Sequence, residues 1–414
     1  MNRSLLTVLL IFLLCQPAQA DLEYDPTHGV KLIGFARLAA DGFVPGPVSG
    51  QFIEKTHGKP VPFQQGQPVQ GFSALLDNGD GSFLALADNG YGARVNSPDF
   101  LLRVYRIWPE FKTAQGGAGT LRAEPFFTLH DPDRQVPFSI VADHESYPFG
   151  EQNIPVDPGI RAGRLLTGSD FDPESFQRLP DGTFWIGDEF GPWLLHTDAT
   201  GRVLEPPVAL PGIKGPDNPE PGSGEPLAER SGGFEGMALS PGGTLLHPML
   251  EKPLKNGDRN LAIFTFDPKT RRFLQAGQEI ARLYYPMDEG STAIGDLTAF
   301  GNSGFLVIER DSGKGPTAMI KRIYRVNFTD RSAQGVLRKR LVVDLMNVSD
   351  PDNLGGAASG SFSFPFWTIE SLVVLDAQTI IVLNDNNYPF GLGRYPDQGQ
   401  AEDSEMILLR LPDQ

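Results

Sequence analysis

A strand–turn–strand pattern that carries one polar or acidic residue in each strand recurs five times along the chain. The paired positions are Ser73 and Asp88, Glu174 and Asp188, Glu235 and Glu251, Asp296 and Glu309, and Glu370 and Asp385. The two members of each pair lie 13 to 16 residues apart, which fits two antiparallel strands joined by a tight turn such as Asp80-Gly81. Such a recurrence predicts a repeat fold built from small antiparallel sheets.

Further strands are expected after several copies, so each unit should hold about four strands, as a β-propeller blade does. The first positions of successive copies are separated by 101, 61, 61 and 74 residues, and the gap of 101 is wide enough for a sixth, degenerate copy around 126–145. The 47 Gly and 36 Pro residues suit many short strands joined by turns. We therefore predict an all-β fold, a single β-propeller of about six four-stranded blades within a range of five to seven. Long loops should join the blades, and a last strand at 406–411 should close the ring.

The N-terminus has the three parts of a secretory signal peptide. A basic start at Arg3 precedes an apolar run over 5–14 and an Ala-x-Ala end at Ala20. The run is too short to span a membrane as a helix. We predict that residues 1–20 are removed, that 21–414 form the propeller domain, and that the protein is secreted or periplasmic.

The only cysteine, Cys15, lies inside this leader. Lipid attachment at Cys15 is the alternative reading of the leader, and the bulky Leu14 before it disfavours that alternative. The mature chain would then have no disulfide, no thiolate metal ligand and no cysteine nucleophile. Its net charge would be −17, since the whole chain carries −16 and the leader holds one basic residue. This charge argues against nucleic acid as a partner, because a nucleic-acid binder needs a basic face.

The repeated acids are candidate metal ligands. Inner strands of a propeller line its central channel, so these carboxylates should converge near the axis: Glu174, Asp188, Glu235, Glu251, Asp296, Glu309, Glu370 and Asp385. Like charges packed together raise each other's pKa, which a bound divalent cation would offset. Oxygen ligands without cysteine indicate Ca²⁺, with Mg²⁺ or Mn²⁺ as alternatives. The competing interpretation is that these acids cap turns or accept hydrogen bonds from backbone amides between blades.

Cations stand beside two of these acids, since Lys252 follows Glu251 and Arg310 follows Glu309. A ring of acids interrupted by Lys and Arg suits an anionic ligand held by metal and basic groups together, and ordinary ion pairing at blade ends is the alternative. Serine-hydrolase and zinc-protease motifs are absent from the sequence. Asp88, Asn89 and Glu189 adjoin the acidic set.

Several stretches resemble the "esterase-like activity of phytase" family of secreted proteins. They are Asp172-Pro173-Glu174-Ser175-Phe176, Gly182 to Pro192, Gly233-Phe234-Glu235-Gly236-Met237-Ala238, and Glu370-Ser371-Leu372 through Asn384-Asp385-Asn386-Asn387. The resemblance runs from roughly Val30 to Leu411. It implies a β-propeller and phosphoester hydrolysis, and it brings no catalytic set with it.

The leading hypothesis is a secreted, phytase-like hydrolase that acts on a small anionic phosphoester and depends on a divalent metal, with Ca²⁺ expected from the ligand type. The metal would bind phosphoryl oxygens and activate water, Lys252 and Arg310 would hold the remaining oxygens, and Glu189 would act as general base. Two alternatives stay open. One is a non-catalytic binding or scaffold propeller, and the other is a lactonase-type carboxyl-ester hydrolase that uses the same metal.

Overall fold

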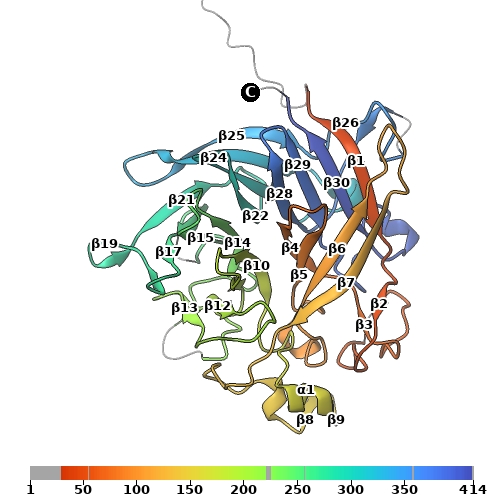
Figure 1. Ribbon diagram of the computed structural model, residues 1–414, viewed down its shortest axis with the longest axis vertical. Helices are drawn as coiled ribbons and strands as arrows, with labels where there is room; N and C mark the ends of the chain where they lie inside the picture. The colour runs from red at the N-terminus through yellow and green to blue at the C-terminus, as the bar shows by residue number, and fades with distance from the viewer. Residues whose placement is uncertain (1–28, 55, 221–224, 256, 357–358, 413–414) are drawn as a thin grey trace, which may run out of the picture.

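The repeat units fold into blades around a common centre in the computed structural model, which describes residues 29–412 except 55, 221–224, 256 and 357–358 (Figure 1). The predicted leader therefore lies outside the described residues. The first blade contains β4 (Phe72–Asp77), β5 (Phe83–Ala87), β6 (Arg103–Glu110) and β7 (Thr120–Thr128), and the second contains β10 (Pro173–Arg178), β11 (Phe184–Asp188), β12 (Trp193–Thr197) and β13 (Val208–Ala209). The third contains β14 (Phe234–Leu239), β15 (Leu246–Leu250), β16 (Asn260–Phe264) and β21 (Arg282–Pro286). The fourth contains β22 (Ala293–Phe300), β23 (Gly304–Arg310), β24 (Lys321–Arg331) and β25 (Leu337–Asp344).

The fifth blade joins the two ends of the described chain. Its order is β28 (Ile369–Asp376), β29 (Thr379–Asn384), β30 (Ser404–Arg410) and β1 (Lys31–Leu38). β1 and β30 are antiparallel, with Lys31 opposite Arg410 and Leu38 opposite Ser404. The structure therefore confirms the predicted closing of the ring, since the first and last strands share one sheet.

The innermost strands lie side by side in the closed order β4, β10, β14, β22, β28 and back to β4, around the centre of the view in Figure 1. The protein is thus an all-β propeller, and the described residues form five blades, the lower limit of the expected range. No sixth blade forms at 126–145, a segment that the structure describes in full. Its start completes β7, and its remainder holds η2 (Val141–Asp143) before the hairpin of β8 (Ser146–Phe149) and β9 (Gln152–Pro155). This segment leaves the ring between β7 and β10, and it accounts for the extra length of the 101-residue gap.

The core consists of five apolar clusters, each packed between two neighbouring blades. The second strand of a blade has a neighbour on both faces, which is why β23 is buried along its whole length. An outer strand such as β1 instead alternates between buried and partly exposed side chains. Because every blade interface contributes one cluster, the ring itself is what removes the apolar faces from water.

The turns form as the sequence predicts. Gly81 and Gly182 follow Asp80 and Asp181 with φ of 84° and 87°, which favours glycine. The remaining elements are short: β2 (Phe43–Val44), β3 (Gln67–Pro68), η1 (Arg94–Asn96), α1 (Pro158–Gly163), β17 (Phe266–Asp267), β18 (Arg272–Phe273), β19 (Gln275–Ala276), β20 (Glu279–Ile280), η3 (Gly315–Thr317), β26 (Val348–Ser349), β27 (Ser361–Phe362) and η4 (Pro396–Gln398). Within the described residues, no helix has the length and apolar character needed to cross a membrane.

Candidate functional site

Every innermost strand is interrupted near its start by a β-bulge. The residues left out of the ladder are Ser73, Glu174, Glu235, Gly295 and Glu370, one in each blade. A bulge bends the strand and re-aims the extra side chain. Three of the predicted metal ligands, Glu174, Glu235 and Glu370, therefore turn toward the axis at the same level of the ring.

A second set of five residues stands at the same level, at the end of each blade's second strand or directly after it. The residue before each bulge pairs with Ala87, Asp188, Leu250, Glu309 or Asn384. The residues that come next in the chain are Asp88, Glu189, Glu251, Arg310 and Asp385, and all five line one cavity. In every blade, the cavity-lining residue of the second strand comes 15 or 16 residues after the bulged residue of the innermost strand. That near-constant spacing is the sequence feature that selects Glu189 and Arg310 over their neighbours.

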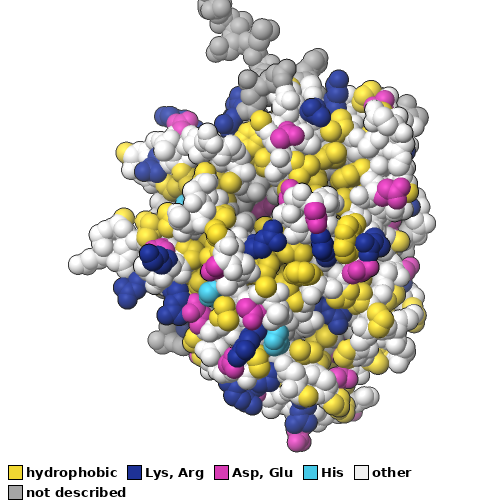
Figure 2. Space-filling model, viewed as in Figure 1, with side chains coloured by type: hydrophobic (Ala, Val, Ile, Leu, Met, Phe, Trp, Pro, Cys, Tyr) yellow, Lys and Arg dark blue, Asp and Glu magenta, His cyan; other side chains and the backbone are white. Residues whose placement is uncertain are grey.

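The cavity has a volume of about 620 Å³ and opens at this end of the central channel. Eight carboxylates and two cations face it: Asp88, Asp172, Glu174, Glu189, Glu235, Glu251, Glu370 and Asp385, with Lys252 and Arg310. Over the face of the molecule shown in Figure 2, in contrast, side chains of both signs are interspersed. The cavity is thus far more one-sided in charge than this face of the molecule.

Two of the predicted ligands point away from this cavity and support the backbone. Asp188 accepts hydrogen bonds from the N–H groups of Asp172 at 2.8 Å and Gly191 at 2.7 Å. Glu309 is fully buried and accepts hydrogen bonds from Tyr285 Oη and Asp288 N, at 2.6 and 2.8 Å. The geometry gives both residues the capping role that was the alternative interpretation of the repeated acids.

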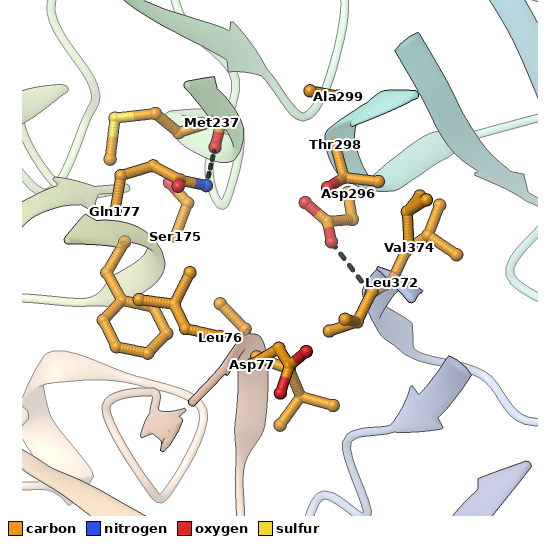
Figure 3. A pocket seen from close by; sticks show the side chains of 14 residues that line it. Leu76, Asp77, Ser175, Gln177, Met237, Asp296, Thr298, Ala299, Leu372 and Val374 are labelled. Atoms are coloured by element: carbon orange, nitrogen blue, oxygen red, sulfur yellow. Dashed lines mark hydrogen bonds between the residues drawn. The ribbon is translucent and has the colours of Figure 1, made fainter. Parts of the chain in front are cut away.

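Asp296 also lies outside the acidic cavity, because the fourth copy is displaced by one residue from the alignment that the sequence suggested. Gly295 is the bulged residue of that blade, and Asp296 follows it. Its carboxylate accepts hydrogen bonds from Leu297 N at 2.7 Å and Leu372 N at 2.9 Å. It faces a smaller cavity of about 180 Å³ that is lined by later residues of the innermost strands (Figure 3).

The two cations hold different places. Arg310 is 5% exposed, and its Nη2 lies 2.9 Å from Glu251 Oε1, 3.2 Å from Glu370 Oε1 and 3.8 Å from Glu235 Oε1. Lys252 is partly exposed, with its Nζ 2.8 Å from Glu251 Oε2. Arg310 is therefore surrounded by glutamates, whereas Lys252 lies nearer to solvent.

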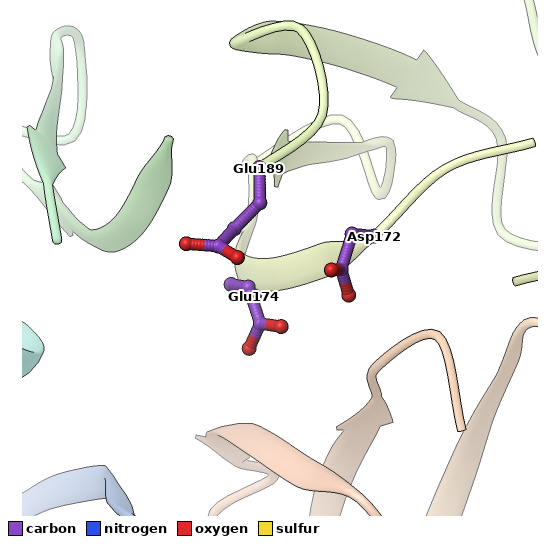
Figure 4. A group of neighbouring side chains, drawn as sticks. All are labelled: Asp172, Glu174 and Glu189. Atoms are coloured by element: carbon purple, nitrogen blue, oxygen red, sulfur yellow. The ribbon is translucent and has the colours of Figure 1, made fainter. Parts of the chain in front are cut away.

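Two groups of carboxylates are spaced closely enough to share a cation. In each, one oxygen from every residue lies within 4.8 Å of the others, and Glu174 belongs to both. The first group is Asp172, Glu174 and Glu189, which gather around one space in Figure 4, and the second is Glu174, Glu235 and Glu370. In the first, Glu189 is 6% exposed and its Oε1 accepts no hydrogen bond from any described residue. An all-carboxylate donor set with an unsatisfied buried oxygen fits a hard divalent cation.

The pKa values of these acids are raised. Burial raises the pKa of Glu174 well above its ordinary value, and the charges of Asp172 and Glu235 raise it further. Burial, with the charge of Asp385, raises the pKa of Glu370 to about 8, although Arg310 opposes the rise. Burial also raises the pKa of Asp172 to about 6. Nearby positive charge in addition to Arg310 and Lys252 would let more of these groups ionise.

Asp172 is the member of the site that the repeat analysis missed. It lies just before β10, outside the repeated strands, so no periodic pattern marks it. Its carboxylate is held by Asn89, whose backbone N and Nδ2 donate to Oδ1 at 3.1 Å and Oδ2 at 2.6 Å. Asn89, which the sequence placed beside the acids, thus orients a ligand candidate of the next blade.

The family described as esterase-like activity of phytase, or phytase-like, matches residues 67–388. An uncharacterized secreted protein of Arthroderma benhamiae is 30% identical over 153 residues, which cover 31% of this chain and 30% of that relative. The chain thus matches less than a third of the relative's length.

Solved propeller structures are similar at low identity. The aldose sugar dehydrogenase of Streptomyces coelicolor is 12% identical, with 94% of this chain and 99% of that chain covered and a TM-score of 0.37. The arabinanase of Bacillus subtilis is 10% identical, with 84% and 96% covered and a TM-score of 0.37. The calcium-binding protein regucalcin of Agrobacterium tumefaciens is 10% identical, with 84% and 93% covered and a TM-score of 0.34. Likenesses at this level carry no argument about activity.

Proposed function

Because the chain belongs to the phytase-like family, we propose that it is a metal-dependent ester hydrolase that acts on a small phosphoester in the acidic cavity. The observation that carries the proposal is the unsatisfied, buried Oε1 of Glu189 in a group of three carboxylates. A buried carboxylate oxygen without a hydrogen bond is costly unless a cation or water satisfies it. The predicted leader and the secreted relative support a place of action outside the cytoplasm.

Asp172, Glu174 and Glu189 are the residues that would hold the cation, and Ca²⁺ is the metal that their oxygen ligands suit best. When bound, such a cation supplies a Lewis acid that polarises an ester and lowers the pKa of a water molecule. In this proposal Glu189 is a metal ligand, which replaces the general-base role expected from the sequence. Asn89 fixes the ligand geometry through its two hydrogen bonds to Asp172.

Lys252 is the group that would attract and orient an anionic substrate. Its side chain is 29% exposed and lines the cavity beside Glu251. Arg310, for which the sequence suggested the same role, is buried and engaged by three glutamates through Nη2. Lys252 Nζ also has protein partners, Glu251 and the carbonyl oxygens of Arg230 and Ser231, but its side chain is the more exposed of the two. The proposal therefore assigns binding of the phosphoryl oxygens to Lys252.

The charge balance of the cavity favours a second candidate, hydrolysis of an uncharged carboxyl ester or lactone. Eight carboxylates against two cations repel a phosphate dianion unless bound metal offsets them. A neutral ester would meet no such repulsion and would use the same cation to polarise its carbonyl group.

An activity panel tests these candidates. The purified protein is assayed on aryl phosphomonoesters, phosphodiesters and γ-lactones, each with CaCl₂ and with EDTA. We expect Ca²⁺-dependent phosphoester hydrolysis that Glu189→Gln abolishes, whereas Glu124→Gln, at an exposed site on β7, retains it. Turnover of lactones alone would support the second candidate. Calcium binding without turnover on any substrate would support a non-catalytic binding propeller and contradict the hydrolase.

A further inference from the structure

The fourth blade departs from the other blades at both repeated positions of the site. At the bulge it has Gly295, where three blades have glutamate and the first has Ser73. A Cβ on Gly295 would lie 1.9 Å from the carbonyl oxygen of Ile369, so no side chain fits there. At the end of the second strand it has Arg310, where the other four blades have a carboxylate. One blade thus lacks both acids and contributes a cation.

The guanidinium of Arg310 occupies a place among the carboxylates that resembles that of a bound ion. Its Nη2 is within 4 Å of oxygens from Glu235, Glu251 and Glu370, which come from two other blades. Glu235 and Glu370 are also two of the three members of the second carboxylate group. An arginine keeps its charge at every pH that proteins tolerate, so it can neutralise such a group permanently.

The first carboxylate group differs in this respect. The ion pairs of Lys252 and Arg310, the two cations of the cavity, are with Glu235, Glu251 and Glu370, and not with Asp172, Glu174 or Glu189. Glu189 Oε1 of the first group and Glu235 Oε1 of the second both accept no hydrogen bond from a described residue, but Glu235 Oε1 lies 3.8 Å from Arg310 Nη2. The two groups share Glu174, yet among the described residues only the second has members, Glu235 and Glu370, in a direct ion pair with a protein cation.

We propose that Arg310 is a built-in cation that occupies the second group, so that the protein binds one divalent cation and not two. The divalent cation binds at Asp172, Glu174 and Glu189, and the guanidinium excludes a second one from the space beside Glu235, Glu251 and Glu370. This inference rests on the proposed metal site and adds its stoichiometry. It also predicts that removal of the guanidinium converts the centre into a two-metal site.

The test is a count of bound metal in the wild type and in Arg310→Met, by titration calorimetry with Ca²⁺ and by Mn²⁺ electron paramagnetic resonance. We expect one ion per chain in the wild type and two in Arg310→Met. Arg310→Lys, which keeps the positive charge, should bind one. Adding Glu189→Gln to Arg310→Met should return the count from two to one, since only the first group loses a ligand.

Two ions in the wild type, or one ion in both the wild type and Arg310→Met, would overturn the inference. If Arg310→Met fails to fold, Glu370→Gln decides instead, because Glu370 belongs only to the group next to Arg310. Its metal count should stay at one, and loss of binding would show that the divalent cation belongs to the second group. A wild type that binds no ion while Arg310→Met binds one would contradict the proposed function but support the blocking role of Arg310.

Discussion

The sequence predicted Glu309 as a metal ligand, whereas the structure shows it supporting the fold. Replacement of Glu309 by Gln distinguishes these two roles. The carboxylate accepts hydrogen bonds from Tyr285 Oη at 2.6 Å, Ser291 Oγ at 2.5 Å and Asp288 N at 2.8 Å. Lys339 Nζ lies 2.6 Å from Oε2. An amide retains one acceptor oxygen, but its NH₂ group faces groups that are themselves donors.

The size of the effect follows from these partners. Removing one member of a buried ion pair costs about 3–5 kcal/mol of stability. Lys339 keeps a second carboxylate, with Asp288 Oδ1 at 2.8 Å, so the lower end applies. We expect the free energy of unfolding to fall by about 3 kcal/mol. For a chain of this length, that loss lowers the melting temperature by roughly 4 °C.

The assay is scanning calorimetry of both proteins in EDTA and in CaCl₂. The variant should melt lower by the same amount in both buffers, and the increment that Ca²⁺ gives should match that of the wild type. Glu124→Gln, an exposed glutamate, serves as the control and should melt like the wild type. If Glu309→Gln melted like the wild type in EDTA and lost its response to Ca²⁺, Glu309 would be a metal ligand and the capping argument would fail.

Three further outcomes follow from the site. Glu174→Gln should lose most of the stabilisation by Ca²⁺, yet in EDTA it should melt at or above the wild-type temperature, because one of several repelling charges is gone; a lower melting point in EDTA would indicate a structural role. Lys252→Met should raise the KM for a phosphoester roughly tenfold, because a charge-assisted hydrogen bond is lost, and should leave the KM for a lactone unchanged. Equal effects on both substrates would argue against anion binding by Lys252. Burial raises the pKa of Asp296 to about 7 and that of Glu370 to about 8, so both groups keep their protons in the folded protein at pH values where the unfolded chain loses them. In EDTA their contribution to the free energy of unfolding should therefore be complete below about pH 4 and be lost as the pH rises toward 8. Urea unfolding at pH 5 and pH 8 measures this loss, which Asp296→Asn should reduce; a stability that rises over this range would contradict the assignment.

Most of the fold could be predicted from the repeated pattern, because strand, turn and strand each leave a local mark. The blade count could not be predicted, because the segment inserted between the first two copies has about the length of a repeat unit but does not form a blade. The site was harder still, because it depends on strand register. Asp188 precedes Glu189, and Glu309 precedes Arg310, and a shift of one residue in a strand exchanges its two faces. The bulges that set this register form when the strand pairs with its neighbour, so no local sequence pattern predicts their positions.

The pairing of β1 with β30 has a consequence for the order of events during folding. The two strands stand at opposite ends of the described chain, and contacts between residues so far apart in sequence form slowly. Glu370 and Asp385 belong to the blade that this pairing completes, so two walls of the acidic cavity depend on it. We expect the amides of β30 to gain protection from hydrogen exchange later than those of β23, which pulse labelling during refolding can measure. The second carboxylate group, which includes Glu370, could then not assemble until the ends of the described chain had met, whereas Asp172, Glu174 and Glu189 come from a single stretch of the chain at the second blade.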